Sequence, residues 1–199
     1  METFSIILGI VAALLHGSGY LIYNIQTRLG KSEPRIITWL IWVFLTILNA
    51  LSYNVMSGDF VATLQFFMGS VACIATFLYV IMIGKFKRPE RNDWLMFGLA
   101  ALAVAVWAIF RSATGANMII LLATAISFVP TLIGVWEDPF VETPLAWNLW
   151  TTAYIISTTN LLFRDCPAVA FIGPVAMIFA HGAIAVLSTE SRKRRFSKN

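Results

Sequence analysis

Seven apolar stretches, each close to the length of a membrane-crossing helix, dominate this chain of 199 residues. They run roughly over residues 3–26, 36–57, 60–84, 94–110, 115–136, 144–163 and 167–188. A helix needs about 20 apolar residues to cross a hydrocarbon layer of about 30 Å. A strand in lipid must belong to a closed barrel and alternates in polarity, which these stretches do not. The pattern therefore predicts an all-α membrane protein with seven transmembrane helices.

The composition excludes a water-soluble domain. Hydrophobic residues make up 59% of the chain and charged residues 12%, against about 45–50% and about 25% in soluble domains. Such a chain has too little polar surface to cover a globule in water. The opening METFSIILGI lacks the basic residues of a signal peptide, so we expect the first stretch to be a helix of the protein. Cys73 and Cys166 have no metal-binding spacing.

The charged residues predict the orientation in the membrane. With seven crossings, all of the 14 basic residues except Arg111 and Arg164 fall on the side that holds the C-terminus. Basic residues accumulate on the cytoplasmic side of membrane proteins. We therefore predict a protein of the cell membrane with its N-terminus outside and its C-terminus in the cytoplasm. The basic ending RKRRFSKN would then bind anionic lipid, and nucleic acid is not an expected partner.

A pair of tryptophans three positions apart occurs twice, in TWLIW at residues 38–42 and in AWNLW at residues 146–150. The same shift of 108 positions places Thr46 on Tyr154, Asn49 on Ser157 and Ser52 on Asn160. The first three stretches thus correspond to the last three, and the fourth is left over. Because a three-helix unit begins and ends on opposite faces, one extra crossing gives the second unit the orientation of the first. We predict two parallel three-helix bundles, residues 1–86 and 113–188, a linker helix, residues 87–112, and a basic tail, residues 189–199.

This 3+1+3 layout resembles the PQ-loop, or SWEET-like, superfamily of small-solute transporters over nearly the whole chain. The local marks are LGKSEPRIITWLIW after the first stretch and FVPTLIGVWEDPFVETPLAWNLW across the fifth and sixth. In these segments Pro130 resembles the family's proline near the end of a bundle's first helix, and Pro34 and Pro144 resemble its helix-opening prolines. The first bundle departs from the pattern with YLIY at residues 20–23. The tryptophan-rich second helices are also similar to those of PnuC-type vitamin transporters.

One face of the second and of the sixth predicted helix carries both aromatic and polar side chains. At 100° per residue, Trp42, Thr46 and Asn49 fall in one sector, and the matching residues of the sixth helix repeat those angles. Two such faces would enclose a pocket near the middle of the membrane, where indole rings stack on a flat or ring-shaped solute. The predicted binding residues are Trp42, Thr46, Asn49, Ser52, Gln65, Trp150, Tyr154, Ser157 and Asn160. The same amides and hydroxyls would equally serve to bond one helix to another.

Histidines and prolines inside the stretches have two interpretations each. His16 and His181 would be either proton relays or neutral rings bonded to a neighbouring helix, and the lack of an Asp or Glu inside the stretches favours the second. The same lack argues against coupling to protons or sodium. Pro130 and Pro174 interrupt the fifth and seventh stretches, so we predict hinges there, with static kinks as the alternative.

The sequence contains no H-E-x-x-H, no G-x-S-x-G and no P-loop, so we expect no enzyme, no catalytic residue, no metal and no cofactor. The prediction is a facilitator that carries a small neutral polar solute, such as a sugar, nucleoside or vitamin, by alternating access. The alternative is a non-transporting membrane receptor or partner module on the same fold. The expected partners are a small-molecule solute and the lipid bilayer, and the sequence leaves the oligomeric state open.

Overall fold

The computed structural model describes residues 1–30, 36–83 and 91–189, apart from the side chains of Ile37, Thr38, Asn92, Asp93, Met96 and Pro130. Within this part the chain is helical and has no strand, which confirms the all-α prediction. Pro34 and the basic tail from residue 190 onward lie outside the described residues. The same holds for some of the basic residues behind the predicted orientation: Lys31, Arg35, Lys85, Lys87 and Arg88.

Each predicted stretch corresponds to one α-helix of the described chain. The elements are α1 (Glu2–Arg28), α2 (Ile36–Ser57), α3 (Phe60–Ile83), α4 (Arg91–Phe110), α5 (Ala113–Glu137), α6 (Pro144–Leu161), the 3-10 turn η1 (Ala168–Phe171) and α7 (Ile172–Leu187). The boundaries agree with the predicted ones to within a few residues because glycines, prolines and capping side chains punctuate the apolar runs.

The turn between α2 and α3 illustrates this punctuation. Gly58 has a φ of +67°, a backbone conformation that glycine adopts without steric cost. Asp59 follows and caps α3, because its Oδ1 accepts a hydrogen bond from the Ala62 amide at 2.8 Å. The two helices are therefore joined by a very short turn and lie against one another.

Within the described residues, five helices are long and apolar enough to cross a membrane: α1, α2 from Trp39, α3, α5, and the run Ala168–Leu187 that joins η1 to α7. In α4 the apolar stretch Phe97–Phe110 is shorter, and α6 contains several threonines and asparagines. Large apolar side chains such as Leu14, Leu78 and Phe179 are exposed on the outside of the bundle, as lipid-facing residues are. These features support a multi-pass helical membrane protein, and the number of crossings stays a prediction.

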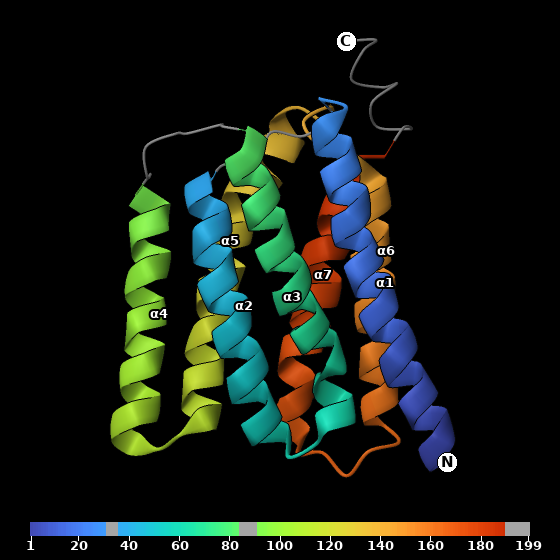
Figure 1. Cartoon of the computed structure of the whole chain (residues 1–199), viewed down its shortest axis with the longest axis vertical. Coiled ribbons are helices and arrows are strands. Elements are labelled where there is room, and N and C mark those ends of the chain that lie inside the picture. Colours follow the sequence, from blue (N-terminus) through green and yellow to red (C-terminus); the bar gives the residue numbers. More distant parts are fainter. Residues whose placement is uncertain (31–35, 84–90, 190–199) are drawn as a thin grey trace.

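Six helices form a closed ring in the order α1, α3, α2, α5, α7, α6, with α6 returning to α1. Helix α4 lies outside this ring, against α5 and α2, at the edge of the bundle in Figure 1. The chain begins at one end of the bundle, and α7 ends toward the other (Figure 1). The contacts of α1 with α6 and of α2 with α5, and a smaller contact of α3 with α6, join the first three helices to the last three. The interior of the ring is therefore walled by both sets of helices.

Candidate functional site

A cavity of about 50 Å³ lies inside the ring, and each of the six ring helices contributes to its wall. The wall combines aromatic rings, amides, hydroxyls and two imidazoles, and it contains no charged side chain among the described residues. Its residues are His16, Tyr20, Trp42, Leu45, Thr46, Asn49, Tyr53, Phe66, Gly69, Asn117, Leu121, Thr124, Tyr154, Gly173, Met177 and His181. One water needs at least about 10–15 Å³, whereas pockets for drug-sized ligands measure about 300–1,000 Å³. In this conformation the cavity fits an uncharged group of a few atoms.

Trp42, Thr46, Asn49 and Tyr154 are the predicted binding residues that line the cavity. The Asn49 Oδ1 atom accepts a hydrogen bond from Asn117 Nδ2 at 2.8 Å, which holds the amide in place. Asn117 is not among the predicted residues, although it also lines the cavity and is 1% exposed. The sequence signal for Asn117 is an amide inside the apolar run of α5. Because Asn117 is close to the start of the helix, it resembles a residue at the membrane interface.

Ser52 and Asn160 bond helices to one another. Ser52 Oγ accepts from Asn117 Nδ2 at 3.0 Å, which joins α2 to α5. Asn160 Oδ1 accepts from Ser5 Oγ at 2.7 Å, which joins α6 to α1. The helix-to-helix interpretation therefore describes both residues, and neither belongs to the cavity wall. Ser157 is buried as well and lies outside the wall.

Gln65 is buried beside His16 rather than in the cavity wall. Its Nε2 lies 3.1 Å from His16 Nδ1, so α3 holds the imidazole of α1. On α7, His181 Nδ1 lies 2.8 Å from the Met177 carbonyl oxygen of the same helix. The Tyr154 ring contacts both histidines, with its ring centroid 5.2 Å from each imidazole. Two imidazoles, from the two helices that flank α6, thus face the same α6 tyrosine.

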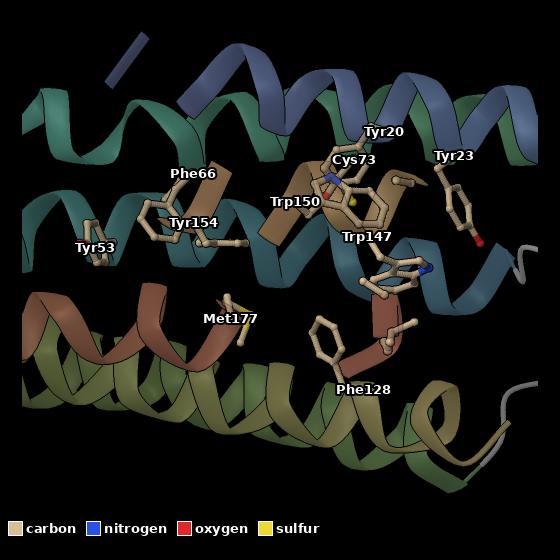
Figure 2. Packing of buried hydrophobic residues seen from close by; sticks show 14 of the residues in the cluster. Tyr20, Tyr23, Tyr53, Phe66, Cys73, Phe128, Trp147, Trp150, Tyr154 and Met177 are labelled. Carbon is tan, nitrogen blue, oxygen red and sulfur yellow. The ribbon is translucent and has the colours of Figure 1, made fainter. Parts of the chain in front are cut away.

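Both tryptophan pairs belong to one aromatic cluster, which consists of Tyr20, Tyr23, Trp39, Trp42, Phe128, Trp147 and Trp150. The Trp147 and Trp150 ring centroids are 5.1 Å apart, and those of Trp39 and Trp42 are 6.5 Å apart. Trp150 also donates from Nε1 to the His16 carbonyl oxygen at 3.1 Å. Trp150 does not line the cavity. Figure 2 shows Trp147, Trp150 and Tyr23 at one level of the helices and Tyr53, Phe66 and Tyr154 at another. The aromatic cluster therefore packs one end of the cavity.

At the opposite end, polar contacts connect the first three helices to the last three. Arg164 forms an ion pair with Asp59, in which Arg164 Nε lies 2.6 Å from Asp59 Oδ2. The two side chains are 19% and 14% exposed, so the pair is partly shielded from water. Nearby, burial raises the pKa of the Cys166 thiol, because desolvation disfavours the thiolate.

Pro174 lies at the junction of η1 and α7, where the backbone changes from 3-10 to α-helical. A proline has no amide hydrogen for the carbonyl four residues earlier, which is that of Ala170. Tyr53 Oη donates to this carbonyl oxygen at 2.8 Å, so α2 supplies the missing bond. Hinge motion at Pro174 stays a prediction. Pro130 lies within α5, and its side chain is outside the described part.

No family model, no curated protein and no solved structure matches this chain. The resemblance to the PQ-loop superfamily therefore stays a prediction that rests on layout and local motifs.

Proposed function

We propose that this protein is a seven-span membrane facilitator that carries a small neutral polar solute by alternating access between two parallel three-helix bundles. The observation that carries this proposal is the cavity inside the ring, whose wall takes aromatic and polar groups from all six ring helices and no charge from the described residues. A neutral solute needs hydrogen-bonding partners and apolar contact in such a site, whereas an ion would need a countercharge.

The shift of 108 positions supports the two-bundle arrangement. It relates α1 (Glu2–Arg28) to α5 (Ala113–Glu137), and α2 (Ile36–Ser57) to α6 (Pro144–Leu161). Under this shift the contact of α1 with α6 corresponds to the contact of α5 with α2, as expected for two units around a central axis. In the 3+1+3 layout α4 is the linker helix, which lies outside the ring.

Packing at both ends of the cavity is consistent with a closed conformation between two open ones. The aromatic cluster packs one end, and the Asp59–Arg164 pair and the Tyr53–Ala170 bond tie the other. A solute larger than a few atoms requires the ring to widen, because the cavity measures only about 50 Å³. Rocking of one bundle against the other is a means of widening that leaves the helices intact.

Uptake into proteoliposomes tests the proposal. We expect one member of a labelled panel of sugars, nucleosides and vitamins to enter vesicles with the protein faster than empty vesicles. Trp42→Ala and Asn49→Ala should reduce that uptake by about tenfold, since a lost ring contact or hydrogen bond is worth about 1 kcal/mol or somewhat more. Trp94→Ala and Asn148→Ala are matched controls, because both side chains are exposed away from the cavity. Equal uptake by all four variants would contradict the site.

The small cavity also favours a second candidate, a non-transporting receptor or partner module on the same architecture. Such a protein would bind its ligand without a path to both faces. Solute binding to the purified protein with no flux above empty vesicles, under either direction of gradient, would identify this case.

A further inference from the structure

The two histidines of the cavity wall present opposite hydrogen-bonding groups, and this difference points to a class of solute. His16 and His181 are 5% and 6% exposed, come from α1 and α7, and are the only histidines in the sequence. No carboxylate of the described residues bonds either ring, and a charged imidazole buried without a partner is costly, so both rings are neutral. In a neutral imidazole one nitrogen donates and the other accepts.

The protein contacts indicate which nitrogen carries the hydrogen in each ring. The Gln65 amide nitrogen has no lone pair to offer, so it donates to His16 Nδ1, and the hydrogen of His16 is on Nε2. The Met177 carbonyl can only accept, so the hydrogen of His181 is on Nδ1, and His181 Nε2 is an acceptor. No described residue bonds either Nε2 atom. The cavity therefore has one imidazole donor from α1 and one imidazole acceptor from α7.

Gly69 leaves the His16 donor accessible. A β-carbon at residue 69 would lie 2.9 Å from His16 Nε2, closer than real contacts allow. Gly69 lines the cavity together with His16, so the missing side chain keeps this edge of the ring open toward the cavity. Beside it, the buried carbonyl oxygen of Gln65 has no partner among the described residues, which adds an unmet acceptor.

We propose that the cavity recognises a planar, uncharged amide group, to whose oxygen His16 Nε2–H donates and from whose N–H His181 Nε2 accepts. An amide is a small flat group whose strong acceptor and donor are bonded to the same carbon. It has a few heavy atoms, which suits a cavity of about 50 Å³. The rings of Trp42 and Tyr154 in the wall provide flat apolar surface for it. This inference rests on the proposed function and narrows its solute to a compound that carries such a group.

Nitrogen NMR of the two rings tests the assignment directly. We would label the full-length protein with [15N]histidine in lipid nanodiscs, assign the two rings with single His→Gln variants, and identify the protonated nitrogen of each. The expected result is hydrogen on Nε2 of His16 and on Nδ1 of His181. The same protonated nitrogen in both rings would overturn the proposal.

Two probes of nearly equal size and shape then test recognition. Acetamide has an oxygen acceptor and N–H donors, whereas acetone has only the acceptor. We expect acetamide to shift the Nε2 resonances of both histidines, and acetone to shift that of His16 alone. Equal responses to the two probes, or no response to acetamide at concentrations that saturate ordinary weak sites, would overturn the proposal.

Gln65 serves in this scheme as a positioning residue for His16. In Gln65→Glu the carboxylate would accept from Nδ1, which moves the hydrogen away from Nε2, and acetamide affinity should fall about tenfold for one lost bond. Gln65→Met, of similar size, would leave the His16 hydrogen on either nitrogen and gives a second variant if the first does not fold. Thr159→Val is the control, because that side chain is exposed. Unchanged affinity and unchanged protonation in both Gln65 variants would contradict this role.

Flux of [14C]acetamide separates this inference from the proposed function. Binding to both histidines without flux of any solute would refute transport and leave amide recognition in place. Flux of a sugar or nucleoside without any response of the histidines to acetamide would refute amide recognition and leave transport in place.

Discussion

Replacing Gly19 by alanine tests how closely α1 packs against α6. A β-carbon at residue 19 would lie 2.7 Å from Cδ1 and 2.9 Å from Cε2 of Trp150. These distances are well below ordinary carbon contacts, and the Trp150 ring is buried among neighbours on several helices. The indole would have to shift, which would break its hydrogen bond to the His16 carbonyl oxygen, now 3.1 Å long.

The expected loss of stability follows from three contributions. Overpacking a buried site costs about 1–3 kcal/mol, and losing a buried hydrogen bond costs about 0.5–1.5 kcal/mol. Alanine in a helix interior recovers about 0.5–1 kcal/mol relative to glycine. The free energy of unfolding of Gly19→Ala should therefore be lower by about 2 kcal/mol, which lowers Tm by about 4–8 °C in a chain of this size.

Thermal unfolding of the purified protein in nanodiscs, followed by tryptophan fluorescence, measures this change. Gly98→Ala is the matched control, because Gly98 is an exposed glycine within α4 and a β-carbon there meets nothing within 4 Å. The control should unfold at the wild-type temperature or slightly above it. If Gly19→Ala behaves like Gly98→Ala, the packing of Trp150 against α1 described above is wrong.

Two further changes test other contacts. Tyr53→Phe leaves the Ala170 carbonyl without a donor and should lower the free energy of unfolding by about 1–2 kcal/mol in chemical denaturation. In a Pro174→Ala background the new amide serves that carbonyl, so the same substitution should cost less, and an equal cost in both backgrounds would contradict the assignment. For Cys166, burial raises the pKa of the thiol, so less thiolate is present near neutral pH than for an ordinary cysteine. Labelling of the Cys73→Ala protein by a membrane-impermeant maleimide on intact cells should be slow at neutral pH and accelerate at higher pH. Labelling only after permeabilisation would contradict the predicted orientation.

The helices could be predicted from the sequence because their signal is local. Apolar runs of membrane-spanning length bounded by glycine, proline and charged residues leave little choice of structure in lipid. The helical wheel likewise identifies the face of α2 that carries Trp42, Thr46 and Asn49, and all three line the cavity. The direction in which a side chain points from a helix follows from its position in that helix alone.

The partners of these residues could not be predicted, because each contact depends on a second helix. The wheel places Ser52 and Asn160 beside the cavity residues on the same stripe, yet both side chains form bonds between helices. Depth along the helix, together with a polar residue on the neighbour, decides between the two outcomes. The Tyr53–Ala170 bond spans 117 positions of sequence, and it depends on a carbonyl that a proline leaves without its helical donor. No local sequence pattern therefore predicts this bond.

Two of the polar bonds between the first and last three helices, each between a serine and an asparagine, use reversed partners. Where α5 meets α2, the asparagine, Asn117, is on α5 and the serine, Ser52, is on α2. Where α1 meets α6, the serine, Ser5, is on α1 and the asparagine, Asn160, is on α6. Both asparagines belong to the last three helices, and the position 108 residues before Asn117 is Gly9. A symmetric pair made from two copies of the first three helices would therefore set Ser52 against a glycine and contain neither asparagine of these bonds. The first half therefore cannot replace the second, and a homodimer engineered from the first half would need an asparagine introduced at each seam.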